Sequence, residues 1–122
     1  MSDNSAVLDE TIHQSVRLRI MTLLVSQPAS ALVAYRFIQR TLDLTGGNLT
    51  VHLRKLREAG YVTITKEFRD EKPSTWIQAT TTGRQAFARY LTNLERVLKG
   101  VAVPGAPITI PQGPPSPSRP SA

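Results

Sequence analysis

The chain has 122 residues, which corresponds to a single domain. Its 15 Lys and Arg against 9 Asp and Glu give a formal net charge of +6, which permits a polyanionic partner. Cysteine is absent, and this excludes a disulfide scaffold, thiolate metal sites and cysteine nucleophiles. No apolar stretch approaches the roughly 20 residues of a membrane span, and the start of the chain lacks the apolar run of a secretory signal. We therefore expect a cytoplasmic protein without a membrane partner.

The end of the chain differs in composition from the rest. Seven of the nine prolines lie in residues 104–122, mixed with Gly, Ser and one charged residue, Arg119. Such a segment cannot bury enough apolar surface to offset its ordering entropy. The sequence predicts a folded domain over residues 7–99 and a proline-rich disordered tail over 100–122.

The first elements are helical. Residues 8–12 predict a short helical turn capped by Asp9, and Ser15 is expected to cap the next helix. That helix has an apolar stripe of Val16, Ile20, Leu23 and Leu24 at positions i, i+4, i+7 and i+8. Ser26 and Pro28 end it.

Two further helices follow closely. The first covers about residues 32–42, with Val33, Phe37 and Ile38 on its core face. The second, over residues 45–59, starts at Thr45, a good N-cap, and ends before Gly60, which suits a left-handed C-cap. Its core face consists of Leu49, Leu53 and Leu56.

A hairpin comes next. Residues 61–68 alternate apolar and polar side chains, residues 75–80 form a second strand, and the polar segment 69–73 forms the turn. We expect Phe68 and Trp76 to lie in the core of this hairpin.

The last helix is predicted to begin at a cap on Thr81 or Thr82 and to run to about Lys99. Its apolar residues, Phe87, Tyr90, Leu91, Leu94, Val97 and Leu98, are close to a heptad stripe. This stripe fits either the core or a dimer seam. We expect a dimer seam, because a terminal helix has little domain left to cover.

The order helix, helix, helix, hairpin, helix predicts an α+β, mainly helical fold. The second and third helices form a helix-turn-helix, the hairpin is a wing, and a dimerisation helix completes the domain. In this arrangement the helix over 45–59 has a polar and cationic face opposite its leucines, as major-groove binding requires. Asn48 could pair with adenine and Arg54 with guanine or a phosphate. Gly46 and Gly47 would let the backbone approach DNA closely.

The sequence also resembles a known family. Four segments carry the resemblance: IHQSVRLRIMTLL (12–24), LTGGNLTVHLRKLREAGYV (44–62), KEF (66–68) and TTTGRQAFARYLTNLE (80–95). They are similar to the compact, single-domain group of the winged-helix transcriptional regulators of the MarR and ArsR superfamily. The resemblance implies a homodimer that binds a palindromic operator in double-stranded DNA, with recognition helices in successive major grooves and the wing, 68–75, on flanking DNA. The positions that would face DNA are Thr45, Gly47, Asn48, Thr50, Val51, His52, Arg54 and Lys55, with Arg69 and Lys72 on the wing.

Two features distinguish this chain from members of that family. Asp70 and Glu71 at the wing tip would repel phosphate, which argues against deep insertion of the wing. The Cys and His clusters of metal-sensing members are missing, so no metal site and no cofactor are expected. His13 is expected to be structural, whereas His52 could contact a phosphate or lie in solvent.

No arrangement of residues suggests catalysis, so we do not expect an enzyme. Tyr35, Phe37 and Tyr90 are candidates for an effector pocket at the dimer interface, although the sequence names no effector. We expect a sequence-specific transcriptional regulator, most simply a repressor. A winged-helix protein-interaction module and a low-specificity architectural or partition DNA binder stay open as alternatives.

Overall fold

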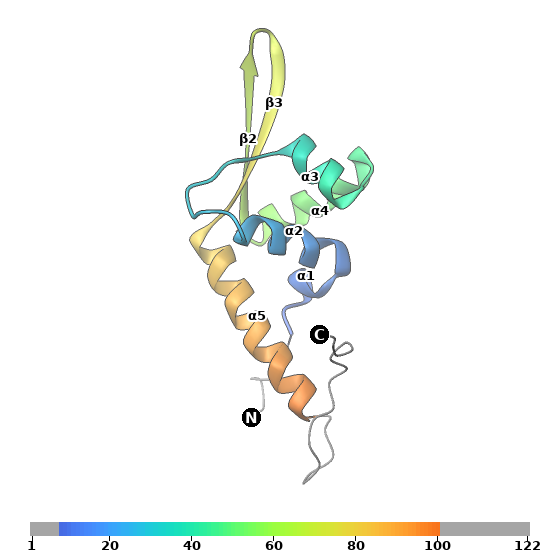
Figure 1. Ribbon diagram of the computed structural model, residues 1–122, viewed down its shortest axis with the longest axis vertical. Coiled ribbons are helices and arrows are strands. Elements are labelled where there is room, and N and C mark those ends of the chain that lie inside the picture. Colours follow the sequence, from blue (N-terminus) through green and yellow to red (C-terminus); the bar gives the residue numbers. More distant parts are fainter. Residues whose placement is uncertain (1–7, 101–122) are drawn as a thin grey trace, which may run out of the picture.

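The computed structural model describes residues 8–100. In chain order the elements are α1 (Glu10–His13), α2 (Ser15–Val25), β1 (Val33–Ala34), α3 (Tyr35–Leu42), α4 (Gly46–Glu58), β2 (Val62–Arg69), β3 (Lys72–Ala79) and α5 (Thr81–Gly100). Helices α1 to α4 form a body, from which the β2–β3 hairpin projects at one end and α5 at the other (Figure 1). The predicted α+β, mainly helical class is confirmed. We call this hairpin the wing; the predicted tail beyond Gly100 lies outside the described residues.

Side chains cap the first two helices. The Asp9 carboxylate accepts hydrogen bonds from the backbone N–H groups of Thr11 and Ile12, as predicted. The N-cap of α2 is Gln14, whose side chain accepts from the backbone N–H of Arg17. The prediction that Ser15 is this cap is wrong, because Ser15 is already the first helical residue.

The segment predicted as one helix over residues 32–42 contains two elements. Val33 and Ala34 pair antiparallel with Ile77 and Trp76, so the sheet has the strand order β1-β3-β2, and α3 begins only at Tyr35. A strand of two residues has no periodicity of its own, and its pairing partner lies far along the chain.

The wing is longer than predicted. Its strands pair from Val62↔Ala79 to Arg69↔Lys72 and leave only Asp70 and Glu71 in the turn. Both turn residues have positive φ, 51° and 64°, as a two-residue type I′ turn requires. The predicted five-residue turn over 69–73 is therefore wrong, because its outer residues continue the ladder.

One apolar core lies where the helices meet the sheet. Its largest fully buried side chains come from α1 to α4, β2, β3 and α5: Ile12, Ile20, Met21, Leu24, Ile38, Leu49, Leu53, Leu56, Val62, Ile77 and Tyr90. The predicted leucine face of α4 is confirmed by the burial of Leu49, Leu53 and Leu56. Phe37, predicted on the core face of its helix, is instead 45% exposed.

The first turn of α5 fixes this helix to the body. The Thr80 hydroxyl accepts from the backbone N–H of Gly83 and donates to the carbonyl of Gly60, so Thr80 is the capping residue rather than Thr81 or Thr82. The Arg84 guanidinium donates to the carbonyls of Leu24, Val25, Gln27 and Pro28. These carbonyls include groups that the end of α2 leaves without helical partners.

Two side-chain contacts attach α1 to distant elements. His13 Nδ1 lies 2.9 Å from the hydroxyl of Tyr90 on α5, which fits the structural role expected of His13. The Tyr61 hydroxyl donates to the Asp9 carboxylate. Burial, followed by this hydrogen bond, raises the pKa of Tyr61 to about 12, so its phenol stays protonated and keeps donating.

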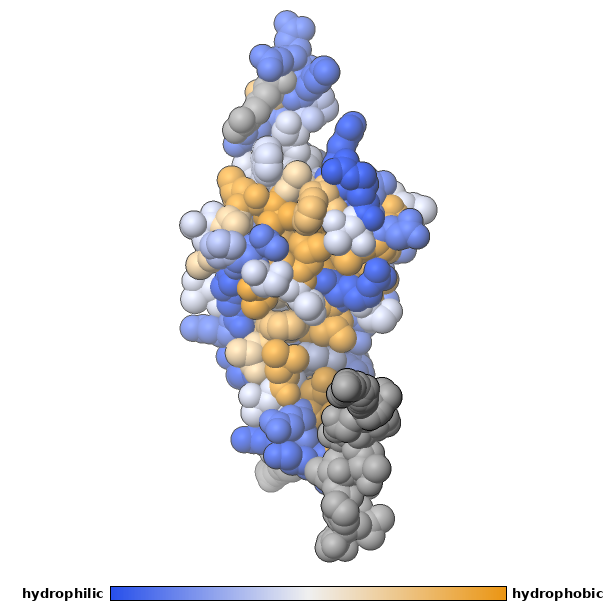
Figure 2. Space-filling view, in the orientation of Figure 1, coloured by the Kyte–Doolittle hydropathy of each residue, from blue (hydrophilic) through white to orange (hydrophobic). Residues whose placement is uncertain are grey.

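The surface separates apolar from polar regions. In the view of Figure 2, hydrophobic side chains gather over the helical body, whereas hydrophilic ones cover most of the wing and the far end of α5. Within residues 8–100, no helix is both long and apolar enough to span a membrane.

Candidate DNA interface

The N-terminal turn of α4 is fixed by two side chains. The Thr45 hydroxyl accepts from the backbone N–H of Asn48 at 3.1 Å, which confirms the predicted cap. The Tyr35 hydroxyl, from the start of α3, donates to the carbonyl of Gly46 at 2.7 Å and lies 2.8 Å from the Thr50 hydroxyl. The bonds of Tyr35 hold the start of α4 against α3 within the helix-turn-helix.

The face of α4 opposite its leucines is open. Most of the residues expected to face DNA are exposed there: Thr45, Gly47, Asn48, Thr50, Val51, Arg54 and Lys55. Their side chains are short near the start of the helix and cationic further along, an order that suits base edges first and phosphates later.

The wing contributes the remaining predicted positions. Lys72 is exposed at the start of β3, next to the turn. Arg69 ends β2 and pairs with Lys72 in the ladder; its side chain lies outside the described atoms.

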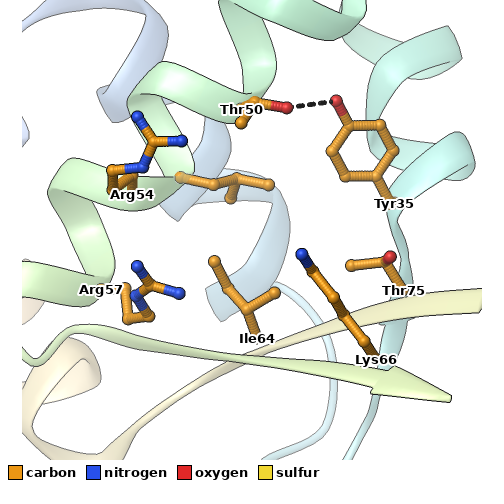
Figure 3. Close-up of a pocket in the computed structure, with 8 residues that line it drawn as sticks. Tyr35, Thr50, Arg54, Arg57, Ile64, Lys66 and Thr75 are labelled. Atoms are coloured by element: carbon orange, nitrogen blue, oxygen red, sulfur yellow. Dashed lines mark hydrogen bonds between the residues drawn. The ribbon is translucent and has the colours of Figure 1, made fainter.

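A cationic cleft of about 340 Å³ lies between α4 and the wing. Arg54 and Arg57 reach it from α4 and Lys66 from β2, around the opening that Figure 3 shows. The other lining residues are Tyr35, Thr50, Leu53, Ile64 and Thr75, so no acidic side chain is among the described residues that line it. Three cations around one open cleft form a favourable site for the phosphates of a polyanion.

The sequence analysis missed Tyr35, Arg57 and Lys66 as site residues. Arg57 follows Arg54 by three positions and therefore shares its side of the helix, which was a usable signal. Lys66 has the same parity as Ile64 along β2, so strand alternation could have indicated it. Tyr35 had no local signal, because its partners Gly46 and Thr50 lie in a different helix.

His52 contacts another side chain of the same protein. Its Nδ1 lies 3.1 Å from the guanidinium of Arg17, which also donates to the carbonyl of Thr11. A guanidinium only donates, so Nδ1 accepts. Burial, and then the charges of Arg17 and Lys55, lower the pKa of His52, which keeps the ring neutral near pH 7 and able to accept. His52 thus links α4 to α2. The sequence had suggested only that it contacts a phosphate or lies in solvent.

The residues expected at a dimer seam divide into two groups. Phe87 and Tyr90 are buried in the core of the chain itself. Leu94 and Val97 are partly buried, and Leu91 and Leu98 are 49% and 51% exposed. Because Leu91, Leu94 and Leu98 are spaced by three and four residues, they lie on one side of α5.

The three aromatic residues expected at an effector pocket of a dimer interface lie in different surroundings in the described chain. Tyr35 lines the cationic cleft, and Phe37 lines a separate groove beside α2 with Leu18 and Leu23. Tyr90 is buried against Phe87 and His13. These three aromatic residues were grouped by type alone, and the fold separates them.

Comparison with known proteins identifies the class. Residues 16–98 match the family model of a winged helix DNA-binding domain, and the chain belongs to this family. The winged-helix resemblance drawn from the sequence is thereby confirmed, and the family is one of DNA-binding transcriptional regulators.

Individual relatives agree with this membership. An uncharacterized protein of Methanocaldococcus jannaschii is 33% identical over 86 residues, which cover 70% of this chain and 90% of the relative. The structure of a transcriptional regulator homologue from Pyrococcus horikoshii OT3 is 33% identical, with a TM-score of 0.68 over 78% of this chain and 91% of that one. A point mutant of MepR from a multidrug resistant clinical isolate of S. aureus shares the fold at 16% identity, with a TM-score of 0.58 over 79% of this chain and 73% of its own.

The bonds of the Tyr35 hydroxyl give a first prediction. Tyr35→Phe should lower the free energy of unfolding by about 1 kcal/mol, since a typical hydrogen bond contributes that much. It should also weaken DNA binding several-fold, because α4 loses a contact that orients it. Urea denaturation and fluorescence anisotropy measure the two effects. Tyr61→Phe, which removes a hydroxyl bonded to Asp9 at the cap of α1 and leaves the start of α4 untouched, is the matched control and should lower stability alone.

Proposed function

We propose that this protein binds a palindromic site in double-stranded DNA as a homodimer and regulates transcription. Each protomer inserts α4 into a major groove and lays its wing on the adjacent DNA. A dimer bound at a promoter would occlude polymerase, so repression is the mode that we propose. A small-molecule effector of unknown identity stays compatible with this role.

The observation that carries the proposal is the exposed polar and cationic face of α4 together with the cationic cleft between α4 and the wing. Arg54, Arg57 and Lys66 surround one cleft, and Asn48 and Thr50 lie exposed on the same helix. The major groove is about 12 Å wide and accepts one helix, while the neighbouring phosphates accept the cations.

The dimer is supported by α5. Leu91 and Leu98 leave about half of their surface exposed on the side that also carries Leu94. A second copy of this stripe would bury them, and we propose that the resulting two-fold axis brings both copies of α4 to one side of the dimer. Half-sites one helical turn apart, roughly 34–36 Å, would then match the two helices.

A salt titration of DNA binding tests the proposal against its alternatives. Fragments selected from random DNA are compared with a mixed-sequence duplex. A regulator should prefer its selected site by about 10³ or more and lose affinity steeply with salt. An architectural binder should show the salt dependence without the preference. Absence of binding at low salt would leave the protein-interaction module.

Arg54→Ala is the sharpest variant for that assay. We expect it to cost about 1–3 kcal/mol of binding to the selected site if Arg54 reads a base, or to reduce the salt slope by about 0.9 if it contacts a phosphate. The control is Arg96→Ala, an exposed arginine on α5 away from the cleft. If Arg54→Ala and Asn48→Ala both bind as tightly as the wild type and as Arg96→Ala, another element reads the DNA.

Gly47→Ala separates a folding role from a binding role. Apart from its chain neighbours and the backbone of its own helix, no heavy atom of the described structure lies within 4 Å of a Cβ built on Gly47. Alanine should therefore leave stability unchanged or raise it by up to about 1 kcal/mol, since glycine is a poor helix former. Close approach of the helix backbone to DNA would nonetheless make the variant bind about tenfold more weakly, as melting and anisotropy would show. Unchanged or tighter binding would contradict this approach.

A further inference from the structure

A second group of cations lies on the flank of α4 that faces away from the cleft. His52 lies about 160° around the helix axis, at 3.6 residues per turn, from Arg54, which lines the cleft. Lys55, three positions further along α4, acts on His52 through its charge, and Arg17 reaches His52 from the first turn of α2. Cations therefore lie on both flanks of α4.

The Arg17 guanidinium is held in place by neutral groups alone. Its Nε donates to the carbonyl of Thr11, and its Nη1 donates to Nδ1 of His52 at 3.1 Å. The side chain is partly buried, and no carboxylate among residues 8–100 forms an ion pair with it. A partly buried cation without a counter-charge is electrostatically unfavourable, so an anion at this position would stabilise it. The guanidinium carries more N–H groups than these two acceptors use.

The flank position of Arg17 suits a duplex that contains α4. The major groove is about 12 Å wide, and a helix with its side chains is about 10–12 Å across. A helix of this size fills the groove, so its two flanks lie against the phosphates of different strands. The cations of the cleft would face one strand, and Arg17 and Lys55 would face the other.

We propose that Arg17 contacts a DNA phosphate on the flank of α4 opposite the cleft, and that His52 is the positioning residue that holds Arg17 for this contact. This inference rests on the proposed function and adds a residue of α2 to its interface. A guanidinium that is already held in the free protein loses less entropy when it binds. Its acceptor has to be neutral, and the lowered pKa of His52 meets this condition near pH 7.

Substitution of Arg17 tests the phosphate contact in the full-length protein. A phosphate contact carries no sequence information, so Arg17→Ala should weaken binding to the selected site and to a mixed-sequence duplex by the same factor. We expect this factor to be about fivefold or more, and the slope of log K against log [salt] to fall by about 0.9. Arg96→Ala removes an exposed arginine of α5 and should leave the slope unchanged. If Arg17→Ala melts early, Arg17→Gln, which removes the charge but keeps an N–H donor, is measured instead.

A double-mutant cycle tests the positioning role of His52. His52→Leu removes the acceptor and should weaken binding about fivefold, because one more long side chain is then ordered on binding. The same substitution should have no effect in the Arg17→Ala background and its full effect in the Arg96→Ala background. His52→Asn places an amide oxygen near the position of Nδ1 and should bind nearly as tightly as the wild type.

The outcomes separate this inference from the proposed function. A wild-type salt slope in Arg17→Ala or Arg17→Gln overturns the phosphate contact. Equal effects of His52→Leu with and without Arg17 overturn the positioning role. Both results leave the proposed function intact, whereas a wild type that binds neither duplex at low salt overturns the proposed function itself.

Discussion

Gly83→Ala should lower the free energy of unfolding by about 3 kcal/mol or more, beyond the usual cost of an added core methyl group. A Cβ built on Gly83 would lie 2.2 Å from the carbonyl oxygen of Tyr61 and 2.9 Å from its carbonyl carbon. These are backbone atoms, so no side-chain rotation can relieve the clash. The start of α5 would have to move away from the sheet.

The clash is severe because the junction is fixed from several directions. The same Tyr61 carbonyl accepts from the backbone N–H of Thr80 at 3.0 Å. Thr80 in turn bonds Gly60 and Gly83, and Gly60 has a φ of 82°, where other residues are strained. Moving α5 would break these bonds and also displace Arg84 from the end of α2.

Urea unfolding of Gly83→Ala, Gly47→Ala and the wild type measures this effect. Gly47 is the matched control, since its substitution adds the same methyl group to the first turn of a helix without a near neighbour among the described residues. A Gly83→Ala variant within 1 kcal/mol of the wild type would mean that α5 is not docked on Tyr61 as described.

Local sequence signals were sufficient for α4. A capping Thr45, leucines at helical spacing and a left-handed Gly60 all act within one helix, so the sequence alone located the helix and its buried face. The exposed site residues followed from the same periodicity. Gly83 gave no such signal, because its constraint comes from the backbone of Tyr61 in another element.

The features that could not be predicted depend on pairing between distant segments. The strand Val33–Ala34 exists because β3 lies beside it. The short turn was missed since Asp70-Glu71 lacks the glycine that usually indicates a type I′ turn. The alternation of apolar and polar residues predicts on which side of its strand Phe68 lies. It does not reveal that the helical body ends before Phe68, which leaves this side chain exposed rather than in the expected hairpin core.

Leu91→Asp should convert the proposed dimer to monomers and weaken operator binding by about 100-fold or more, because a monomer loses the gain that comes from two linked binding elements. In a symmetric seam the substitution would bring two carboxylates into an apolar contact, where charges without partners are strongly unfavourable. Leu91 is half exposed in the protomer, so the fold of each protomer should survive. Sedimentation equilibrium measures the oligomeric state, circular dichroism the fold, and fluorescence anisotropy the affinity for the selected operator.

Arg96→Asp is the control for this effect. It introduces the same side chain on the same helix, about 140° around the axis from Leu91 at 3.6 residues per turn, and it should leave the dimer intact. Adding Leu98→Asp to Leu91→Asp removes the second exposed leucine of the stripe. If this double variant still sediments as a dimer, the seam lies on another surface, and the two α4 helices must be related by a different axis. If it is monomeric yet binds the operator as tightly as the wild type, a single α4 and wing are sufficient for recognition, and the palindrome is not required.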